Sequence, residues 1–135
     1  MKIRIISSRE EINSVRPNEK AIHLAFRASN VDFLNLLQRV PRLQMIQVPP
    51  SYMKTMSKSI GVFLDMQGVK FIEGDVWGHR KDLDEYFTVS DEALKTIRSM
   101  TKAGSPPEEI AKEVQKTTKL GTELIDYIGK AEIEA

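Results

Sequence analysis

The chain has 135 residues, of which 41% are hydrophobic and 29% charged, a composition typical of a globular protein with one domain or two small ones. Its formal net charge is +1, and the absence of cysteine excludes disulfides, iron–sulfur clusters and thiolate zinc sites. No apolar run approaches the roughly 20 residues that span a bilayer, and the first residues lack the apolar stretch of a signal peptide. We therefore expect a cytoplasmic protein without a metal or cofactor.

Four short apolar runs predict β-strands, and they are Lys2–Ile6, Ala21–Phe26, Leu43–Val48 and Val69–Gly74. Their centres lie roughly 20 to 25 residues apart, which leaves room for one helix between each pair, as parallel β-α-β units require. Apolar and polar residues alternate within the runs, whereas strands buried on both faces would be almost continuously apolar. The pattern indicates connecting helices on one face. The other face is solvated, or is covered by the C-terminal helices or a partner chain.

The connections between these runs contain helical patterns, which are Arg9–Val15, Val31–Val40 and Met53–Met66. Asn30 is the predicted N-cap of the second helix, and Gly68 is the predicted stop of the third. A leucine-rich solenoid is an alternative at this spacing, but only LLQRVPRLQMIQV resembles its repeat.

The C-terminal third reads as three short helices joined by tight turns. Ser90 is a predicted N-cap, Gly104 a stop, and Ser105-Pro106-Pro107-Glu108 a capping box that begins a helix reaching Gln115. A third helix is predicted over Lys119–Ile128, ended by Gly129. We therefore expect an α/β fold: a small, mostly parallel four-stranded sheet with connecting helices over residues 1–88, plus a three-helix, helix-turn-helix-like module over residues 89–135.

In a helix-turn-helix the third helix of this module reads nucleic acid, and five residues in the turn before it and in its first turn are the candidate contacts. They are Lys116, Thr117, Thr118, Lys119 and Thr122. Residues 95–119 carry six basic and three acidic residues, which is only a weak basic footprint. Gly121 is expected to interrupt the third helix, and Glu123 and Asp126 oppose phosphate. The alternative is a helical cap that packs on the open sheet face.

Polar residues also follow the predicted strands, at the edge where parallel sheets bind ligands. The candidate anion-binding residues are Arg27, Asn30, Tyr52, Lys54, Asp75, Trp77, His79 and Arg80. Cationic side chains and helix amino ends favour a phosphate at such an edge. Asp75 and His79 are also a weak candidate acid–base pair, whereas His23 within a strand is expected to be structural. The alternative is that these loops are polar because they contact water.

Three motifs lie in the first part of the chain: AFRASN, VPPSYMKTMSKS and EGDVWGHRKDLDEY. With these motifs the chain resembles a family of small uncharacterised archaeal proteins found mainly in methanogens. The resemblance implies a cytoplasmic archaeal protein, and it supplies no activity and no catalytic residues.

The leading hypothesis is a regulatory nucleic-acid-binding protein, such as a transcription regulator, whose α/β part senses an anionic metabolite or mediates dimerisation. Helix-turn-helix proteins commonly bind as two-fold dimers, so a homodimer is expected. The alternatives are a phosphate- or nucleotide-binding module without DNA binding, a protein-interaction module, and a small enzyme of unknown reaction. An enzyme is the less favoured of these.

Overall fold

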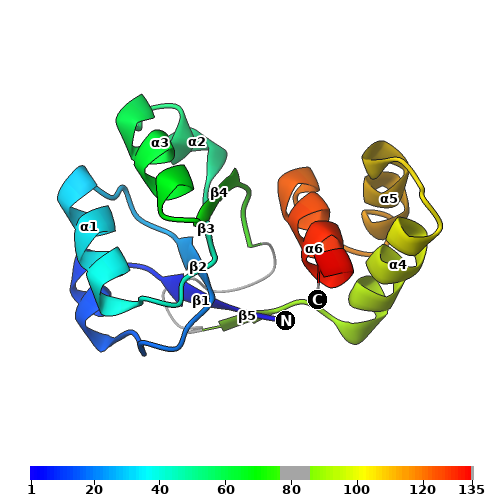
Figure 1. Cartoon of the computed structure of the whole chain (residues 1–135), viewed down its shortest axis with the longest axis horizontal. Coiled ribbons are helices and arrows are strands. Elements are labelled where there is room, and N and C mark those ends of the chain that lie inside the picture. The colour runs from blue at the N-terminus through cyan, green and yellow to red at the C-terminus, as the bar shows by residue number, and fades with distance from the viewer. Residues whose placement is uncertain (77–85, 135) are drawn as a thin grey trace.

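A computed structural model of the chain describes residues 1–76 and 86–134, with side chains described to residue 131. Within this part the sheet has five strands in the order β4-β3-β2-β1-β5 (Figure 1). The strands are β1 (Lys2–Ile6), β2 (Ala21–Leu24), β3 (Met45–Val48), β4 (Lys70–Glu73) and β5 (Tyr86–Thr88). The first four are parallel, which confirms the predicted α/β class with a mostly parallel sheet.

The fifth strand is absent from the prediction. β5 pairs antiparallel with β1, with Ile3 opposite Phe87 and Arg4 opposite Tyr86. Three residues are too few to show an alternating pattern, so this strand depends on its pairing with β1 rather than on a local signal.

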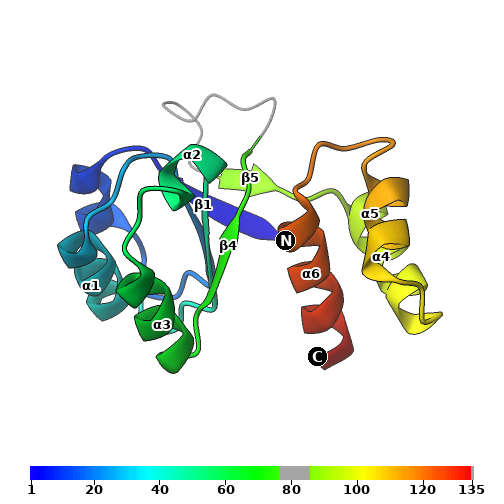
Figure 2. The ribbon, with the colours of Figure 1, turned by 90° about the horizontal axis from the view of Figure 1, so that it is seen from above.

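The connecting segments place helices on one face of the sheet. These are the 3₁₀ helix η1 (Arg9–Ser14), α1 (Asn30–Arg39), α2 (Pro50–Met53) and α3 (Lys58–Met66). Figure 2 shows α1 and α3 side by side against the strands. Phe33 of α1 and Leu64 of α3 are fully buried there with Ile22 and Ile46. This face therefore has its own hydrophobic core.

Two details of these helices differ from the prediction. The N-cap of α1 is Ser29 rather than Asn30, because the Ser29 hydroxyl accepts from the backbone N–H of Asp32. Of the helix predicted over residues 53–66, residues 58–66 form α3, which Ser57 caps, and a separate short helix, α2, precedes it with Pro50 in its first turn. Proline suits a first turn and serine a cap, so each begins a helix of its own.

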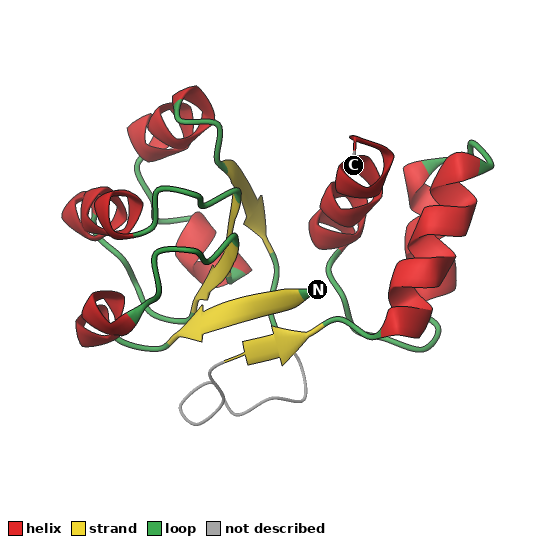
Figure 3. Ribbon diagram, turned by 60° about the horizontal axis from the view of Figure 1, so that its bottom comes forward, coloured by secondary structure: helices red, strands yellow, loops and turns green. Residues whose placement is uncertain are grey.

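The C-terminal helices cover the opposite face of the sheet. They are α4 (Asp91–Lys102), α5 (Pro107–Val114) and α6 (Thr122–Glu134). Leu124 and Ile128 of α6 share one core with Ile3, Met45 and Ile72 of the sheet. Figures 1 and 3 show α6 between the sheet and the pair α4–α5. The open face is thus covered by the C-terminal helices, one of the three alternatives that the sequence allows.

The ends of these helices confirm some of the expected signals and correct others. The Ser90 hydroxyl accepts from the N–H of Ala93, and Gly104 has a left-handed φ of 79° at the end of α4. The predicted Ser105 capping box is absent: Pro106 is the N-cap of α5, without a side-chain bond. Gly121 precedes α6 instead of interrupting it, and Gly129 lies inside that helix.

Gly129 lies inside α6 because the helix packs closely on α4. A Cβ at this position would lie 2.9 Å from the hydroxyl oxygen of Thr101. Within the described residues, no helix is long and apolar enough to cross a membrane.

Candidate nucleic-acid interface and sheet edge

The carboxyl edge of the sheet brings together two of the predicted anion-binding residues. The Arg27 guanidinium lies over the Tyr52 ring, 5.2 Å from its centroid, and Arg27 Nη1 donates to Thr55 Oγ1. Arg27 lies between β2 and α1, and Tyr52 lies in α2. The cation is exposed, so the ring and the hydroxyl orient it while it stays accessible to a ligand.

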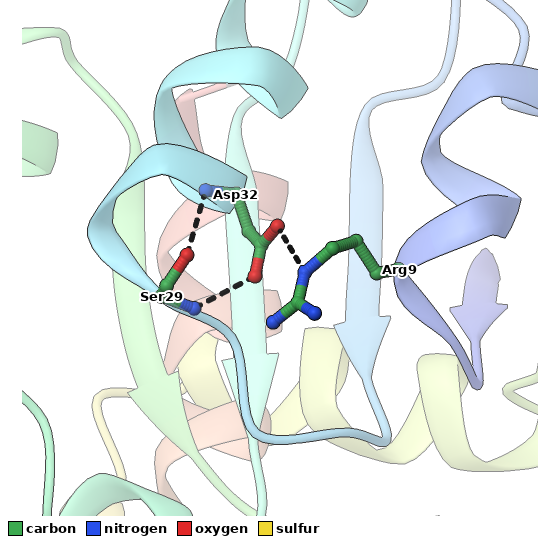
Figure 4. Close-up of polar contacts among 3 residues, drawn as sticks. All are labelled: Arg9, Ser29 and Asp32. Carbon is green, nitrogen blue, oxygen red and sulfur yellow. Dashed lines mark hydrogen bonds and ion pairs between the residues drawn. The ribbon is translucent and has the colours of Figure 1, made fainter.

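The amino end of α1 is already occupied by the protein's own carboxylate (Figure 4). Asp32 Oδ2 accepts from the backbone N–H of Ser29 at 2.8 Å, and Asp32 Oδ1 accepts from Arg9 Nε at 2.8 Å. Burial raises the pKa of Asp32, but the hydrogen bonds from Arg9 and Ser29 outweigh it and hold the pKa below its usual value. The ionised carboxylate would repel an anion at this helix end, so Asn30 is poorly placed to hold one.

Asp75, another predicted edge residue, lies beside the buried His23. Its Oδ1 lies 3.7 Å from Nε2 of the fully buried His23, and it accepts from the N–H of Val76 at 2.8 Å. On the other side of the imidazole ring, His23 Nδ1 lies 2.8 Å from Gln47 Oε1. This arrangement supports the structural role expected for His23.

Three predicted edge residues, Trp77, His79 and Arg80, lie outside the described residues. Lys54 is exposed at the end of α2. The anion site at this edge therefore stays a prediction, with Arg27 and Tyr52 as the pair that the structure brings into contact.

The five candidate nucleic-acid contacts lie along the connection from α5 to α6. Lys116 Nζ pairs with Glu113 Oε2 at 2.8 Å, and the Thr118 hydroxyl donates to the Val114 carbonyl at 2.9 Å. Thr117 and Lys119 are exposed and line a shallow hollow with residues 87–90. Thr122 is the first residue of α6 and is exposed. Four of the five candidates are therefore exposed, and Thr118 is half-buried.

The outward strip of α6 is narrow and mostly acidic. The Glu123 carboxylate accepts from the backbone N–H of Glu73 at 2.6 Å, so it is held against the end of β4. Asp126 pairs with Lys130 at 3.1 Å. Because α6 lies between the sheet and its two partner helices, it offers little basic surface to a phosphate backbone.

The first helix of the module carries the basic surface that α6 lacks. Lys95, Arg98 and Lys102 are all exposed on α4, and their spacing of three and four places them on one face. Ala93 and Ile97 are buried on the opposite face. We call these three cations the α4 stripe. None of the three is among the contacts predicted from the sequence, although the spacing K-x-x-R-x-x-x-K within an amphipathic helix is the signal that indicates such a face.

Comparison with known protein families is consistent with this two-part organisation. Residues 92–130 match the family described as "Protein of unknown function (DUF1699) C-terminal HTH domain". Residues 2–85 match "Family of unknown function (DUF1699) N-terminal domain". Neither description names an organism, so the archaeal origin stays a prediction. No curated protein and no solved structure matches the chain. The chain belongs to the DUF1699 family, with an N-terminal α/β part and a C-terminal helix-turn-helix domain.

Proposed function

We propose that this protein binds nucleic acid through its helix-turn-helix domain and acts as a regulator. The observation that carries the proposal is the α4 stripe, three exposed cations on one face of the first helix in a domain described as helix-turn-helix. In the two-helix motif the helix before the recognition helix, here α5, crosses the phosphate backbone. The α4 stripe lies on the helix that precedes this pair, and its lysine and arginine side chains would add phosphate contacts that do not read sequence.

The contacts divide between backbone and base recognition. The α4 stripe would hold phosphates, and the residues between α5 and α6 would supply the polar contacts near the bases. Lys119 and Thr122 are the best placed to contact bases, since both are exposed. The neighbouring Glu123 carboxylate is held against the backbone of Glu73. The acidic strip of α6 predicts modest affinity and shallow entry into the groove.

The test is fluorescence anisotropy of the full chain on a labelled mixed-sequence DNA duplex and on a single-stranded RNA, at low salt. A triple variant, Lys95→Gln, Arg98→Gln and Lys102→Gln, should lose most of the binding because each phosphate contact contributes to affinity. The matched control replaces three exposed cations of the α/β part by glutamine: Arg16, Arg42 and Lys58.

Both triple variants lose the same charge, so a non-specific effect of net charge would weaken them equally. Loss confined to the α4 variant supports the proposal. Equal loss in both variants, or no binding by the unmodified chain to either nucleic acid, contradicts it.

A homodimer is part of the same proposal. In the described part of the chain, the exposed large hydrophobic side chains lie on α1 and α3: Val31 and Leu34, and Val62 and Met66. Light scattering on the purified chain tests whether this layer pairs two copies and leaves both helix-turn-helix domains outward. A monomer at all concentrations would remove dimerisation from the proposal.

The remaining parts of the hypothesis are also proposals. The division of the chain at residue 88 stays a proposal because the two parts share one core, to which Ile97 of α4 and Ile3 of β1 both belong. Sensing of an anion by Arg27 at the carboxyl edge is another, and Arg27→Ala should abolish any thermal stabilisation produced there by a phosphorylated ligand.

A further inference from the structure

A cleft of about 940 Å³ opens at the amino end of the sheet, opposite to the edge considered above. It is lined by residues from the strand starts, from α4 and from the second half of α6. The volume is within the range of about 300 to 1,000 Å³ that small-molecule sites occupy. The cleft is open to solvent, so a ligand would reach it without a change in fold.

The strand ladder aligns the polar edge of this cleft. The Lys20 carbonyl accepts from the N–H of Gln44 at 2.8 Å, and the Gln44 carbonyl accepts from the N–H of Lys70 at 2.8 Å. These bonds fix the starts of the neighbouring strands: Lys70 lies beside Met45, which lies beside Ala21, and Lys20 and Gln44 directly precede β2 and β3. Lys70 projects from the same sheet face as Ile72, which packs in the core shared with α6.

The charge of the lining is one-sided. Among the residues whose side chains the structure describes, four lysines and no aspartate or glutamate line the cleft. Lys2 lies 5.9 Å from the centroid of the Tyr86 ring, and Lys130 pairs with Asp126. Lys20 and Lys70 have no ion-pair partner within the described residues, so their ammonium groups are available to an anion.

The opposite wall is apolar and partly aromatic. Leu94 of α4 and Tyr127 and Ile128 of α6 line it, and Leu94 and Tyr127 are half-buried. A few polar groups that fix orientation beside a larger apolar wall are typical of a small-molecule site. The ring of Tyr127 offers a face or an edge against which an aromatic base could pack.

We propose that this cleft binds a nucleoside phosphate, with the phosphates between Lys20 and Lys70 and the base against Tyr127 and Leu94. Free phosphate would satisfy only the lysines, and an apolar ligand only the wall, so the combination selects a molecule with both parts. The site is independent of nucleic-acid binding by the α4 stripe. The cleft is lined by both the sheet and α6. A ligand that contacts both would therefore stabilise the packing of the C-terminal helices on the sheet.

The experiment is isothermal titration of the full chain with ATP, GTP, CTP and UTP singly, and with tripolyphosphate. We expect saturable binding of at least one nucleotide, tighter than tripolyphosphate. The double variant Lys20→Gln and Lys70→Gln should weaken this binding by about tenfold or more, because each lost charge removes a charge-assisted hydrogen bond. Lys20→Arg with Lys70→Arg should retain it.

The matched control is Lys58→Gln with Lys112→Gln, two exposed lysines outside the cleft, which should bind as the unmodified chain does. Three results would overturn the proposal: no saturable binding of any nucleotide, equal affinity for tripolyphosphate and nucleotides, or unchanged binding by the Lys20/Lys70 glutamine variant. Loss of nucleic-acid binding in that variant, without nucleotide binding, would assign the lysines to the nucleic-acid surface instead. If the α4 stripe variant binds nucleic acid as the unmodified chain does, the nucleotide-binding proposal is unaffected, because the two tests measure different ligands.

Discussion

Gly74 follows β4 at a position where even one methyl group meets a buried side chain. A Cβ built at this residue would lie 2.4 Å from Gln47 Nε2 and 3.2 Å from Gln47 Cδ. Gln47 is fully buried, and its Oε1 lies 2.8 Å from His23 Nδ1. The amide therefore has no room to move away without losing this contact with the imidazole. Gly74→Ala should accordingly overpack this part of the shared core.

The expected cost is about 1–3 kcal/mol in the free energy of unfolding, the usual range for an extra methylene in a packed core. For a chain of this length, each kcal/mol lowers Tm by roughly 4 °C. Urea denaturation followed by far-ultraviolet circular dichroism measures the free energy directly. The matched control is Gly61→Ala in α3, where an added Cβ meets nothing within 4 Å. That substitution should stabilise the protein by roughly 0.5–1 kcal/mol.

A double-mutant cycle separates the clash from other effects. Gln47→Ala removes the atoms that the new methyl group would meet, so Gly74→Ala should cost less in that background than alone. A destabilisation of the same size in both backgrounds would refute the reasoning, as would a Gly74→Ala variant as stable as the Gly61→Ala control.

Two further predictions concern ionisable side chains that form hydrogen bonds with residues distant in the sequence. Asp32→Ala should lower the free energy of unfolding by about 1 kcal/mol at neutral pH through loss of the cap. Its folded pKa is lowered, so this contribution is present above the unfolded pKa of about 4 and is lost as pH falls through the folded pKa. Urea melts at neutral pH and at about pH 2 should show the deficit shrinking, and a constant deficit would contradict this. The Tyr86 hydroxyl donates to Glu19, and this bond together with burial raises the pKa of Tyr86. Tyr86→Phe should cost about 0.5–1.5 kcal/mol below the unfolded pKa of about 10, and this difference should disappear as pH rises through the folded pKa. Melts across that range check it, and a deficit independent of alkaline pH would argue against the bond.

Much of the fold follows from local patterns. The strand that begins at Lys2 ends at Ile6 as predicted, and the other three parallel strands fall within their predicted runs. Ser90 and Gly104 mark the ends of α4 because a hydroxyl cap and a left-handed glycine are each determined by one residue and its neighbours. Signals of this kind need no knowledge of the rest of the molecule.

The features that the sequence did not reveal depend on distant contacts. β5 exists because Phe87 pairs with Ile3, more than eighty residues away in the chain. Gly129 resembles a helix stop but lies inside α6, where the absence of a side chain allows the close approach to Thr101 of α4. Both features are decided by packing rather than by local propensity.

The candidate sites divide in the same way. The contact between Arg27 and Tyr52 follows from the parallel topology, since residues after neighbouring strands meet at one edge. The cleft beside Lys20 and Lys70 could not be predicted, because it exists only where α6 lies beside the amino end of the sheet. The sequence does not determine whether solvent, the C-terminal helices or a partner chain covers this face of the sheet, so it does not predict the cleft.

The most direct test of the central claim is the salt dependence of nucleic-acid binding by the unmodified chain and by the α4 stripe variant. The logarithm of the association constant for duplex DNA falls with the logarithm of salt concentration by about 0.9 per phosphate contact. If Lys95, Arg98 and Lys102 each hold a phosphate, the glutamine triple variant should have a slope shallower by about 2.7. A slope equal to that of the unmodified chain would contradict the assignment of nucleic-acid binding to this face of the helix-turn-helix domain.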